Sequence, residues 1–258
     1  MKLENKIAVV TGGGGGIGRQ TCRLLAGEGA KIVVADRVLE DAERTAAELS
    51  DAGATAVPMH VEMADDDSIR KLAEQSVERF GHIDILVNNA GARVFGPVTD
   101  ATLEDWAFIL DVNLRGPGLS CKYLIPHMRQ GGSIINISSA NGVVGRPGMA
   151  LYDASKAGLL ALTRSMACDH ADQGIRINAV LPGPTLTDFH IKRAAAEGRE
   201  LDAGLTRPHD DGPGILRRQG LPEEIAAAVV FLATDDASFV TGACFNIDGG
   251  LSAIAQRN

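Results

Sequence analysis

The chain has 258 residues, of which 45% are hydrophobic and 4% aromatic, and its formal net charge is −8. This length and apolar content are enough for a buried core and exclude a disordered chain. The acidic balance argues against a nucleic-acid partner, since sequence-independent binding needs a basic surface. No apolar run approaches the roughly 20 residues of a membrane helix, so we expect no membrane partner and a cytoplasmic location.

Short apolar runs alternate with longer amphipathic ones through the first half of the chain. Apolar runs predict strands, and residues with helical spacing that end near a glycine predict helices. The predicted strands cover residues 7–10, 31–35, 55–59 and 84–87, and the predicted helices cover 17–28, 40–51 and 67–80.

The second half continues the alternation less regularly. A long helical stretch is expected over 102–129, bent at Gly116 and Pro117. Strands are predicted over 133–138, 175–180 and 243–247, and helices over 151–172 and 222–234. The remaining stretch, 187–220, mixes glycine, proline and charged residues. A loop of this length in a compact domain is usually functional, and we expect it to cover the substrate.

The predicted strands are continuous apolar runs, which indicates burial on both faces, as in a parallel sheet covered by helices. Strand–helix alternation without a linker or repeat indicates βαβ units. The sequence therefore predicts one α/β domain over residues 1–258. Its fold is expected to be a Rossmann-type, doubly wound parallel sheet of about seven strands with helices on both faces.

A glycine-rich run from Thr11 to Gly18 joins the first strand to the first helix. Glycines there let backbone amides approach a pyrophosphate at a helix N-terminus. Asp36 ends the second strand, near the spacing of the acid that binds the ribose hydroxyls of NAD. The phosphate of NADP would meet this carboxylate with a repulsion of about 4 kcal/mol at about 4 Å. We therefore expect NAD and regard NADP as less favoured, although the neighbouring Arg37 would soften the repulsion; a turn or helix-cap role is the alternative for Asp36.

Several short motifs follow in order along the chain. They are Thr11-Gly-x-x-x-Gly-x-Gly18, Asn88-Asn-Ala-Gly91, Asn113, Ser139, Tyr152-x-x-x-Lys156, the Pro182-Gly183 segment and Asp248-Gly-Gly250. With these motifs the chain resembles the classical short-chain dehydrogenase/reductase family over nearly its whole length. The spacing of Tyr152 and Lys156 places both side chains on one helix face, and a nearby ammonium favours the ionised form of a phenol.

The resemblance implies an oxidoreductase that transfers hydride between NAD(H) and a secondary alcohol or ketone, without a metal. Tyr152 is then the general acid/base, and Ser139 hydrogen-bonds the substrate oxygen. Lys156 binds the nicotinamide ribose and tunes Tyr152, while Asn113 holds a water that links Lys156 to solvent.

Further site residues carry over from the same resemblance. The expected cofactor-binding residues are Gly12, Gly15, Gly16, Ile17, Gly18, Asp36, Arg37, Glu62, Met63, Asn89, Ala90, Gly91, Tyr152, Lys156, Pro182, Gly183, Thr185 and Thr187. The expected substrate residues are Arg93, Ser139, Asn141, Met149, Tyr152, Pro184, Phe189 and His190. Glu62 departs from the family pattern, which usually has Asp there to contact adenine.

Other interpretations remain open at this point. A catalytically inactive, nucleotide-binding regulatory or scaffold protein would have the same fold, and a related reaction such as epimerisation would use the same residues. The resemblance also implies a homotetramer or homodimer, for which Leu159, Leu160, Thr163 and Ala167 would offer a second apolar helix face. The substrate is expected to be a small molecule of unidentified structure.

Overall fold

The computed structural model describes residues 1–198 and 203–254, without the side chains of Phe189, Lys192 and Ala203. Its seven strands form one parallel sheet in the order β3-β2-β1-β4-β5-β6-β7. The strands are β1 (Ile7–Thr11), β2 (Lys31–Asp36), β3 (Ala56–His60), β4 (Ile83–Asn88), β5 (Met128–Ile137), β6 (Arg176–Pro182) and β7 (Cys244–Ile247). The predicted doubly wound Rossmann-type sheet is confirmed.

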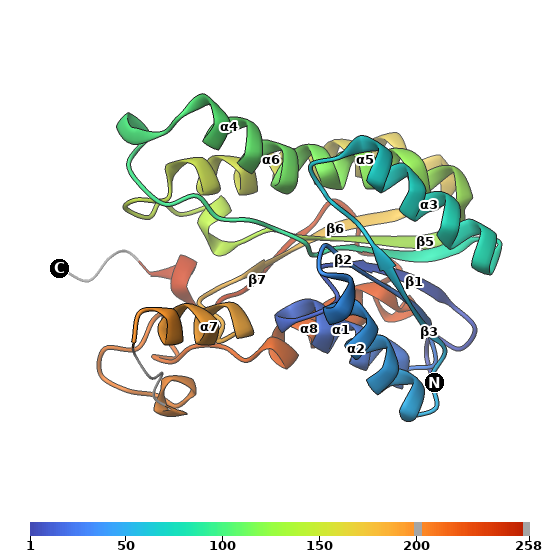
Figure 1. Ribbon diagram of the computed structural model, residues 1–258, viewed down its shortest axis with the longest axis horizontal. Helices are drawn as coiled ribbons and strands as arrows, with labels where there is room; N and C mark the ends of the chain where they lie inside the picture. Colours follow the sequence, from blue (N-terminus) through green and yellow to red (C-terminus); the bar gives the residue numbers. More distant parts are fainter. Residues whose placement is uncertain (199–202, 255–258) are drawn as a thin grey trace.

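Helices cover both faces of the sheet, as Figure 1 shows. The helices are α1 (Gly16–Gly27), α2 (Leu39–Asp51), α3 (Asp66–Phe80), α4 (Leu103–Leu110), α5 (Gly116–Leu124), α6 (Ala150–Asp169), α7 (Asp188–Ala196) and α8 (Pro222–Ala233). The group α1, α2 and α8 packs on one face, and α3, α5 and α6 pack on the other. None of the helices in the described part of the chain combines the length and apolar content needed to cross a bilayer.

Each face of the sheet has its own apolar core, because neighbouring side chains of a strand point to opposite faces. Val10 and Val34 pack with Leu25 of α1 on one side. Val9 and Val33 pack with the α3 and α5 side of the sheet. The central strands are completely buried, which explains why they appear in the sequence as unbroken apolar runs.

The helical stretch predicted over 102–129 is confirmed from Leu103 to His127, but a π-helical turn interrupts it and its last two residues belong to β5. The stretch contains α4, a π-helical turn over Asp111–Arg115, α5 and a short 3-10 turn, and Met128 already belongs to β5. Pro117 is one cause, because it has no amide hydrogen to continue the α-helical pattern. Gly116 lets α5 approach the segment after β3 closely, because a Cβ there would lie 2.6 Å from the Met63 carbonyl oxygen.

The proposed second apolar face of the Tyr152 helix is also wrong. Leu159, Leu160, Thr163 and Ala167 are buried within the chain itself. They face the sheet and its neighbours, so they have no apolar surface left for a second subunit.

The segment 187–220 is less irregular than expected where it is described. It begins with α7, which lies apart from the helices that cover the sheet (Figure 1). Thr187 precedes α7 and His190 completes a capping box with it. Residues 199–202 of this segment lie outside the described residues.

Candidate active site

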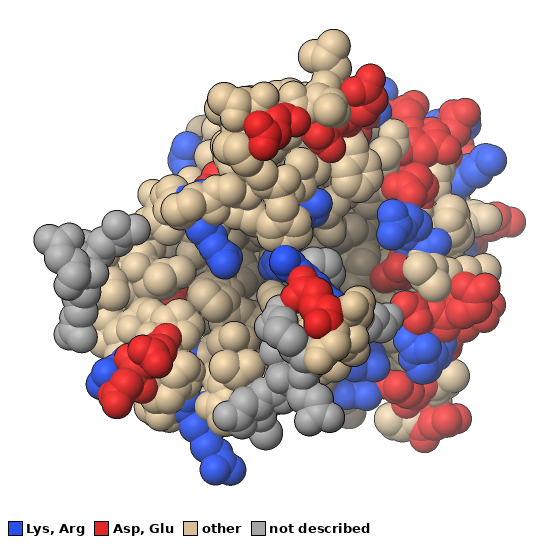
Figure 2. All heavy atoms as spheres, turned by 60° about the vertical axis from the view of Figure 1, so that its left-hand side comes forward, with Lys and Arg blue, Asp and Glu red and all other residues tan. Residues whose placement is uncertain are grey.

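The predicted site residues gather at one edge of the sheet, where β1, β2, β4, β5 and β6 end. The chain direction across the sheet reverses between β1 and β4, and ligands of open α/β sheets bind outside the strand ends at such a point. The surface at this end is hollowed near the centre of Figure 2. The topology therefore brings the nucleotide motifs and the Tyr152 helix to a common place.

The loop after β1 is bound tightly to the loop after β4. Thr11 Oγ1 accepts hydrogen bonds from the amides of Asn89 and Ala90, both at 3.1 Å. Asn89 Nδ2 donates to the carbonyl oxygens of Thr11 and Gly12 at 2.9 and 3.0 Å. A Cβ on Gly18 would lie 2.0 Å from the Gly12 carbonyl oxygen, so only glycine allows this close approach.

The N-terminus of α1 holds a carboxylate. Gly15 precedes the helix without a side-chain cap, and the amide of Gly16 donates to Asp188 Oδ2 at 3.1 Å. Arg19 donates to the same oxygen at 3.2 Å. A helix N-terminus that binds a carboxylate fits the diphosphate of a nicotinamide cofactor. The sequence analysis missed Asp188 and Arg19, since no spacing in the chain links them.

The end of β2 is arranged around Asp36. Its Oδ2 accepts from the Gly14 amide at 2.9 Å and its Oδ1 accepts from the Val38 amide at 3.0 Å. The carboxylate is thus fixed beside the glycine loop. The contact with Val38 also gives Asp36 the turn role that was its alternative interpretation. The next residue, Arg37, is exposed.

The end of β3 fits the expected cofactor contacts less closely. Glu62 Oε1 accepts from the Ala64 amide at 3.3 Å, so the carboxylate bends back on its own loop. Met63 is 4% exposed and packs in the core with α3 and α5. Ile17 of α1 likewise packs against the core on the other face.

Tyr152 and Lys156 lie on α6 and are nearly buried, with 8% and 4% of their surfaces exposed. Lys156 Nζ donates to the Ile137 carbonyl at 2.8 Å and lies 5.9 Å from the centre of the Tyr152 ring. Burial, followed by the nearby charge of Arg93, lowers the pKa of Lys156 to about 8. A Cβ on Gly91 would lie 3.4 Å from both Lys156 Nζ and Asn113 Oδ1, which brings the loop after β4 against the predicted catalytic residues.

Asn113 occupies the π-helical turn and is completely buried. Its Oδ1 accepts from the Ala92 amide at 2.8 Å, and its Nδ2 donates to the Ala92 carbonyl and to Ser155 Oγ, both at 3.0 Å. Its side chain therefore joins the loop after β4 to α6. Its main-chain carbonyl has no α-helical donor, because the residue four positions later is Pro117.

Ser139 begins a short 3-10 turn after β5. Its Oγ accepts from the Asn141 amide at 3.1 Å. The Asn141 side chain donates to Asp153 Oδ1 at 2.7 Å, and the Arg146 amide donates to Asp153 Oδ2 at 3.1 Å. Asp153, which the sequence analysis missed, thus fixes the Ser139 turn against α6.

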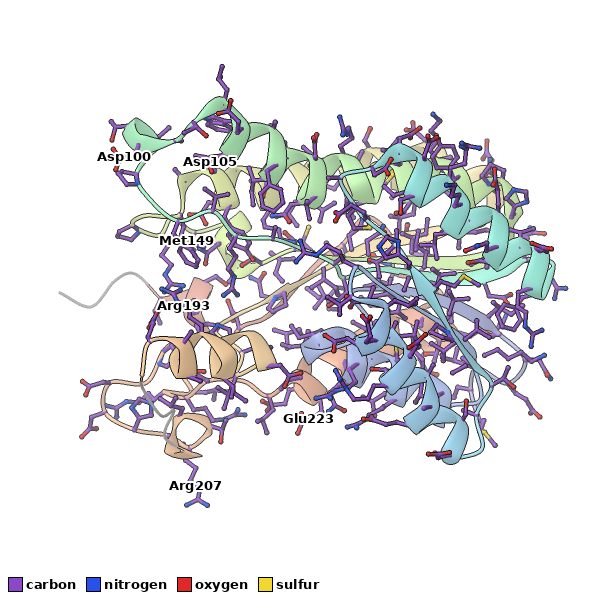
Figure 3. The ribbon with its side chains drawn as sticks, in the orientation of Figure 1. Asp100, Asp105, Met149, Arg193, Arg207 and Glu223 are labelled. Atoms are coloured by element: carbon purple, nitrogen blue, oxygen red, sulfur yellow. The ribbon has the colours of Figure 1, made fainter. Side chains whose placement is uncertain are left out.

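The predicted substrate residues separate into two groups. Arg93 and His190 meet across the site at 3.3 Å, with the Arg93 guanidinium 5.8 Å from the Tyr152 ring centre. Met149 is buried in an apolar cluster with Tyr152, and Figure 3 shows Arg193 rising toward it from α7. Pro184 instead lines a cavity of about 250 Å³ near β7. The Phe189 side chain lies outside the described residues.

The segment after β6 carries the remaining predicted cofactor residues. It runs from Pro182 and Gly183 into Thr185, which is buried and donates to the Gly183 carbonyl at 2.9 Å. Thr187 Oγ1 lies 2.9 Å from His190 Nδ1. Thr187 stands next to the glycine loop, because a Cβ on Gly16 would lie 3.3 Å from the Thr187 Cβ.

Comparison with known proteins gives the family. A family profile described as enoyl-(acyl carrier protein) reductase matches residues 12–252. The chain is 37% identical to meso-2,3-butanediol dehydrogenase of Serratia marcescens, over 98% of this chain and 97% of the relative. It is 40% identical to cis-4-hydroxycyclohexanecarboxylate dehydrogenase of Sinomonas cyclohexanicum, over 98% of both chains.

The chain belongs to the classical short-chain dehydrogenase/reductase family. Among solved structures it resembles the blue fluorescent protein from a metagenomic library, in complex with NADPH, with a TM-score of 0.86 and 35% identity. That likeness covers 97% of this chain and 99% of the other. Members of the family bind nicotinamide cofactors, and the blue fluorescent protein was solved with NADPH. Membership of the family alone therefore does not support a preference for NAD over NADP.

Proposed function

We propose that this short-chain dehydrogenase/reductase oxidises a secondary alcohol, or reduces the corresponding ketone, with NAD(H). One observation carries the proposal: four polar side chains are buried at the same end of the sheet. One lies on the π-helical turn, one follows β5, and two lie on neighbouring turns of α6. They are Asn113, Ser139, Tyr152 and Lys156, and each is at most 8% exposed. Burying polar groups costs free energy unless they are paired, which favours a site maintained for chemistry.

The chain offers a complete set of groups for a dinucleotide. The glycine loop and α1 would hold the diphosphate, Asp36 the adenosine ribose, and Lys156 the nicotinamide ribose. When bound, the nicotinamide accepts or supplies the hydride. The residues of the loop after β4, Asn89 to Gly91, would pack along it.

Proton transfer is the task of the chain's own side chains. The ionised oxygen of Tyr152 takes the proton of the alcohol, and in the reverse direction the Tyr152 hydroxyl gives its proton to the ketone oxygen. Ser139 Oγ donates a hydrogen bond to that oxygen and stabilises its developing charge. The Lys156 ammonium favours the ionised form of Tyr152. The Asn113 carbonyl, left without an α-helical donor by Pro117, would hold a water that links Lys156 to solvent.

The test compares Tyr152→Phe with Tyr123→Phe. The chain has two tyrosines. Tyr123 is a matched control, because its hydroxyl donates to Asp66 at 2.8 Å and so joins α5 to α3. Tyr152→Phe should lower kcat by about a thousandfold or more while NADH binding is kept, and Tyr123→Phe should retain activity. Equal turnover by both variants would overturn the assignment of Tyr152.

Absorbance at 340 nm reports turnover over a panel of candidate substrates. The panel holds diols, cyclic alcohols, sugars, steroids and two hydroxy acids, 3-hydroxybutyrate and 4-hydroxycyclohexanecarboxylate. Two members follow the relatives that act on butanediol and on hydroxycyclohexanecarboxylate. NADH binding without turnover of any panel member would favour the regulatory or scaffold alternative.

A preference for NAD over NADP is part of the proposal and depends on Asp36. Its two backbone hydrogen bonds hold a negative charge beside the glycine loop, where the phosphate of NADP would be repelled. The expected kcat/KM ratio favours NAD, and Asp36→Ala should narrow it by leaving Arg37 to meet the phosphate. A preference for NADP in the unmodified protein would refute this assignment.

We further propose a homotetramer or homodimer, which the family resemblance implies. With the apolar residues of α6 buried in the chain, other surfaces must supply the contacts. Exposed apolar side chains include Leu103 at the start of α4 and Phe239 before β7. Light scattering that shows a stable monomer would contradict an oligomer.

A further inference from the structure

Three arginines from three segments surround the entrance above Tyr152. Arg93 follows β4, Arg146 precedes α6, and Arg193 lies on α7. Arg93 hydrogen-bonds His190 at 3.3 Å and lies 5.8 Å from the Tyr152 ring centre. Arg193 lies 4.6 Å from the Phe95 ring centre, which places it over the loop that follows Arg93. In Figure 2, blue side chains border the central hollow from above and below.

His190 contacts this cluster as a neutral side chain. Burial, and then the charges of Arg93, Arg193 and Arg146, lower the pKa of His190 to about 4, so the imidazole is neutral at neutral pH. An arginine only donates hydrogen bonds, so His190 Nε2 must accept from Arg93. On the other side of the ring, Nδ1 lies 2.9 Å from Thr187 Oγ1, which fixes the imidazole to the first turn of α7. His190 therefore holds Arg93 in place without adding a charge.

Among the residues that the structure describes, the carboxylates of Glu197 and Asp153 lie close to the cluster, and both accept hydrogen bonds from other groups. Glu197 accepts from Arg193 Nε at 2.8 Å, one turn along α7. Asp153 accepts from the Arg146 amide and the Asn141 side chain. Toward the reacting centre the neighbouring charge is again positive, because Lys156 lies beside the Tyr152 ring. The entrance thus presents positive charge to a ligand that reaches Tyr152.

We propose that Arg93 binds a carboxylate of the substrate, with Arg146 and Arg193 strengthening the positive field around it. The substrate class is a secondary alcohol or ketone that carries a carboxylate. A single guanidinium matches a carboxylate in a two-point contact, and among the three arginines Arg93 has the contact with the Tyr152 ring. This inference depends on the proposed function, since Tyr152 is taken as the group that acts on the substrate oxygen.

The test measures each hydroxy acid of the panel against its own methyl ester, which keeps the shape and removes the charge. The acids should have a kcat/KM at least about tenfold above their esters, mainly through KM. Arg93→Gln should lower kcat/KM for the acids about tenfold or more and change it less than about twofold for the esters. Arg129→Gln, an exposed arginine at the other end of β5, is the control and should behave as the unmodified protein.

A binding measurement separates this inference from the proposed function. Calorimetry in the presence of NAD compares cyclohexanecarboxylate with cyclohexanecarboxamide. The acid should bind to the unmodified protein and to Arg129→Gln, and about tenfold more weakly to Arg93→Gln. Equal affinity for acid and amide, together with turnover of esters as fast as acids, would overturn the carboxylate site and leave the proposed function intact. Acid binding that depends on Arg93, without turnover of any alcohol, would fault the proposed function and support the anion site.

Discussion

The carboxylate of Asp188, on the first turn of α7, accepts a hydrogen bond from the backbone amide of Gly16, on the first turn of α1. The two residues are 172 positions apart in the sequence. Through this contact and the ion pair with Arg19, the segment over the substrate side is fixed to the loop expected to bind the cofactor diphosphate. Both the carboxylate and a diphosphate need the same helix N-terminus.

Asp188→Asn should therefore strengthen cofactor binding. A carboxylate at a helix N-terminus contributes about 1 kcal/mol of favourable interaction. Asparagine in its place should compete less with the diphosphate and lower the Kd for NADH about fivefold. Fluorescence titration with NADH measures this. Asp210→Asn, which removes a carboxylate that is 96% exposed in the same segment, should leave the Kd unchanged. A weaker Kd in Asp188→Asn would show that the contact supports the cofactor site instead of competing for it.

Gly18→Ala should destabilise the protein by about 3 kcal/mol or more, because the added Cβ would meet the Gly12 carbonyl oxygen at 2.0 Å. Gly27→Ala, in the same helix, is the matched control, since a Cβ there would have no atom within 4 Å. Alanine in an open helical position should raise stability by about 0.5–1 kcal/mol. Urea unfolding of the two variants should give changes of opposite sign.

Pro117→Ala should lower kcat while the folded state is kept. Alanine supplies the amide hydrogen that the Asn113 carbonyl lacks, so the π-helical turn should relax toward a regular helix and draw that carbonyl away from its water. We expect a loss of about tenfold in kcat, in the lower range for impaired proton transfer. Gly118→Ala is the control, because its Cβ would make an ordinary 3.6 Å contact with Leu162. Unchanged kcat in Pro117→Ala would remove the Asn113 carbonyl from the proton path.

The pH profile should show Lys156. Its pKa is lowered to about 8 by burial and by Arg93, so the ammonium is lost as the pH rises through about 8, and kcat/KM for a neutral ester should fall there. Arg93→Gln removes the second of the two causes, and the fall should move to higher pH. An alkaline limb at the same pH in both proteins would exclude Lys156 as the group that titrates.

The inner strands were predictable because they are buried on both faces and their apolar runs need no knowledge of distant contacts. The helical stretch over 102–129 was predicted two residues too long, because its apolar pattern continues into Met128 and Arg129 at the start of β5. Helix α7 was missed because its capping box uses His190 in place of the usual glutamate or glutamine.

The site divides in the same way. The family resemblance pointed to Tyr152, Lys156, Ser139 and Asn113, whose catalytic roles stay predictions, and the structure buries all four at the same end of the sheet. Asp153 and Asp188 act through contacts that only the folded chain creates. The apolar residues of α6 were misassigned to a subunit interface because periodicity shows that a face is buried without showing what covers it.

The first turn of α7 carries two different contacts within three residues: Asp188 bonds the glycine loop, and His190 bonds Arg93. A shift of this one turn therefore moves a group at the diphosphate position and a group at the substrate entrance together. With the proposed function we therefore expect the affinities for cofactor and substrate to be coupled, and such a coupling is reciprocal. Whatever factor the cofactor imposes on substrate affinity, the substrate must impose on cofactor affinity, so neither Kd is a constant of its own site.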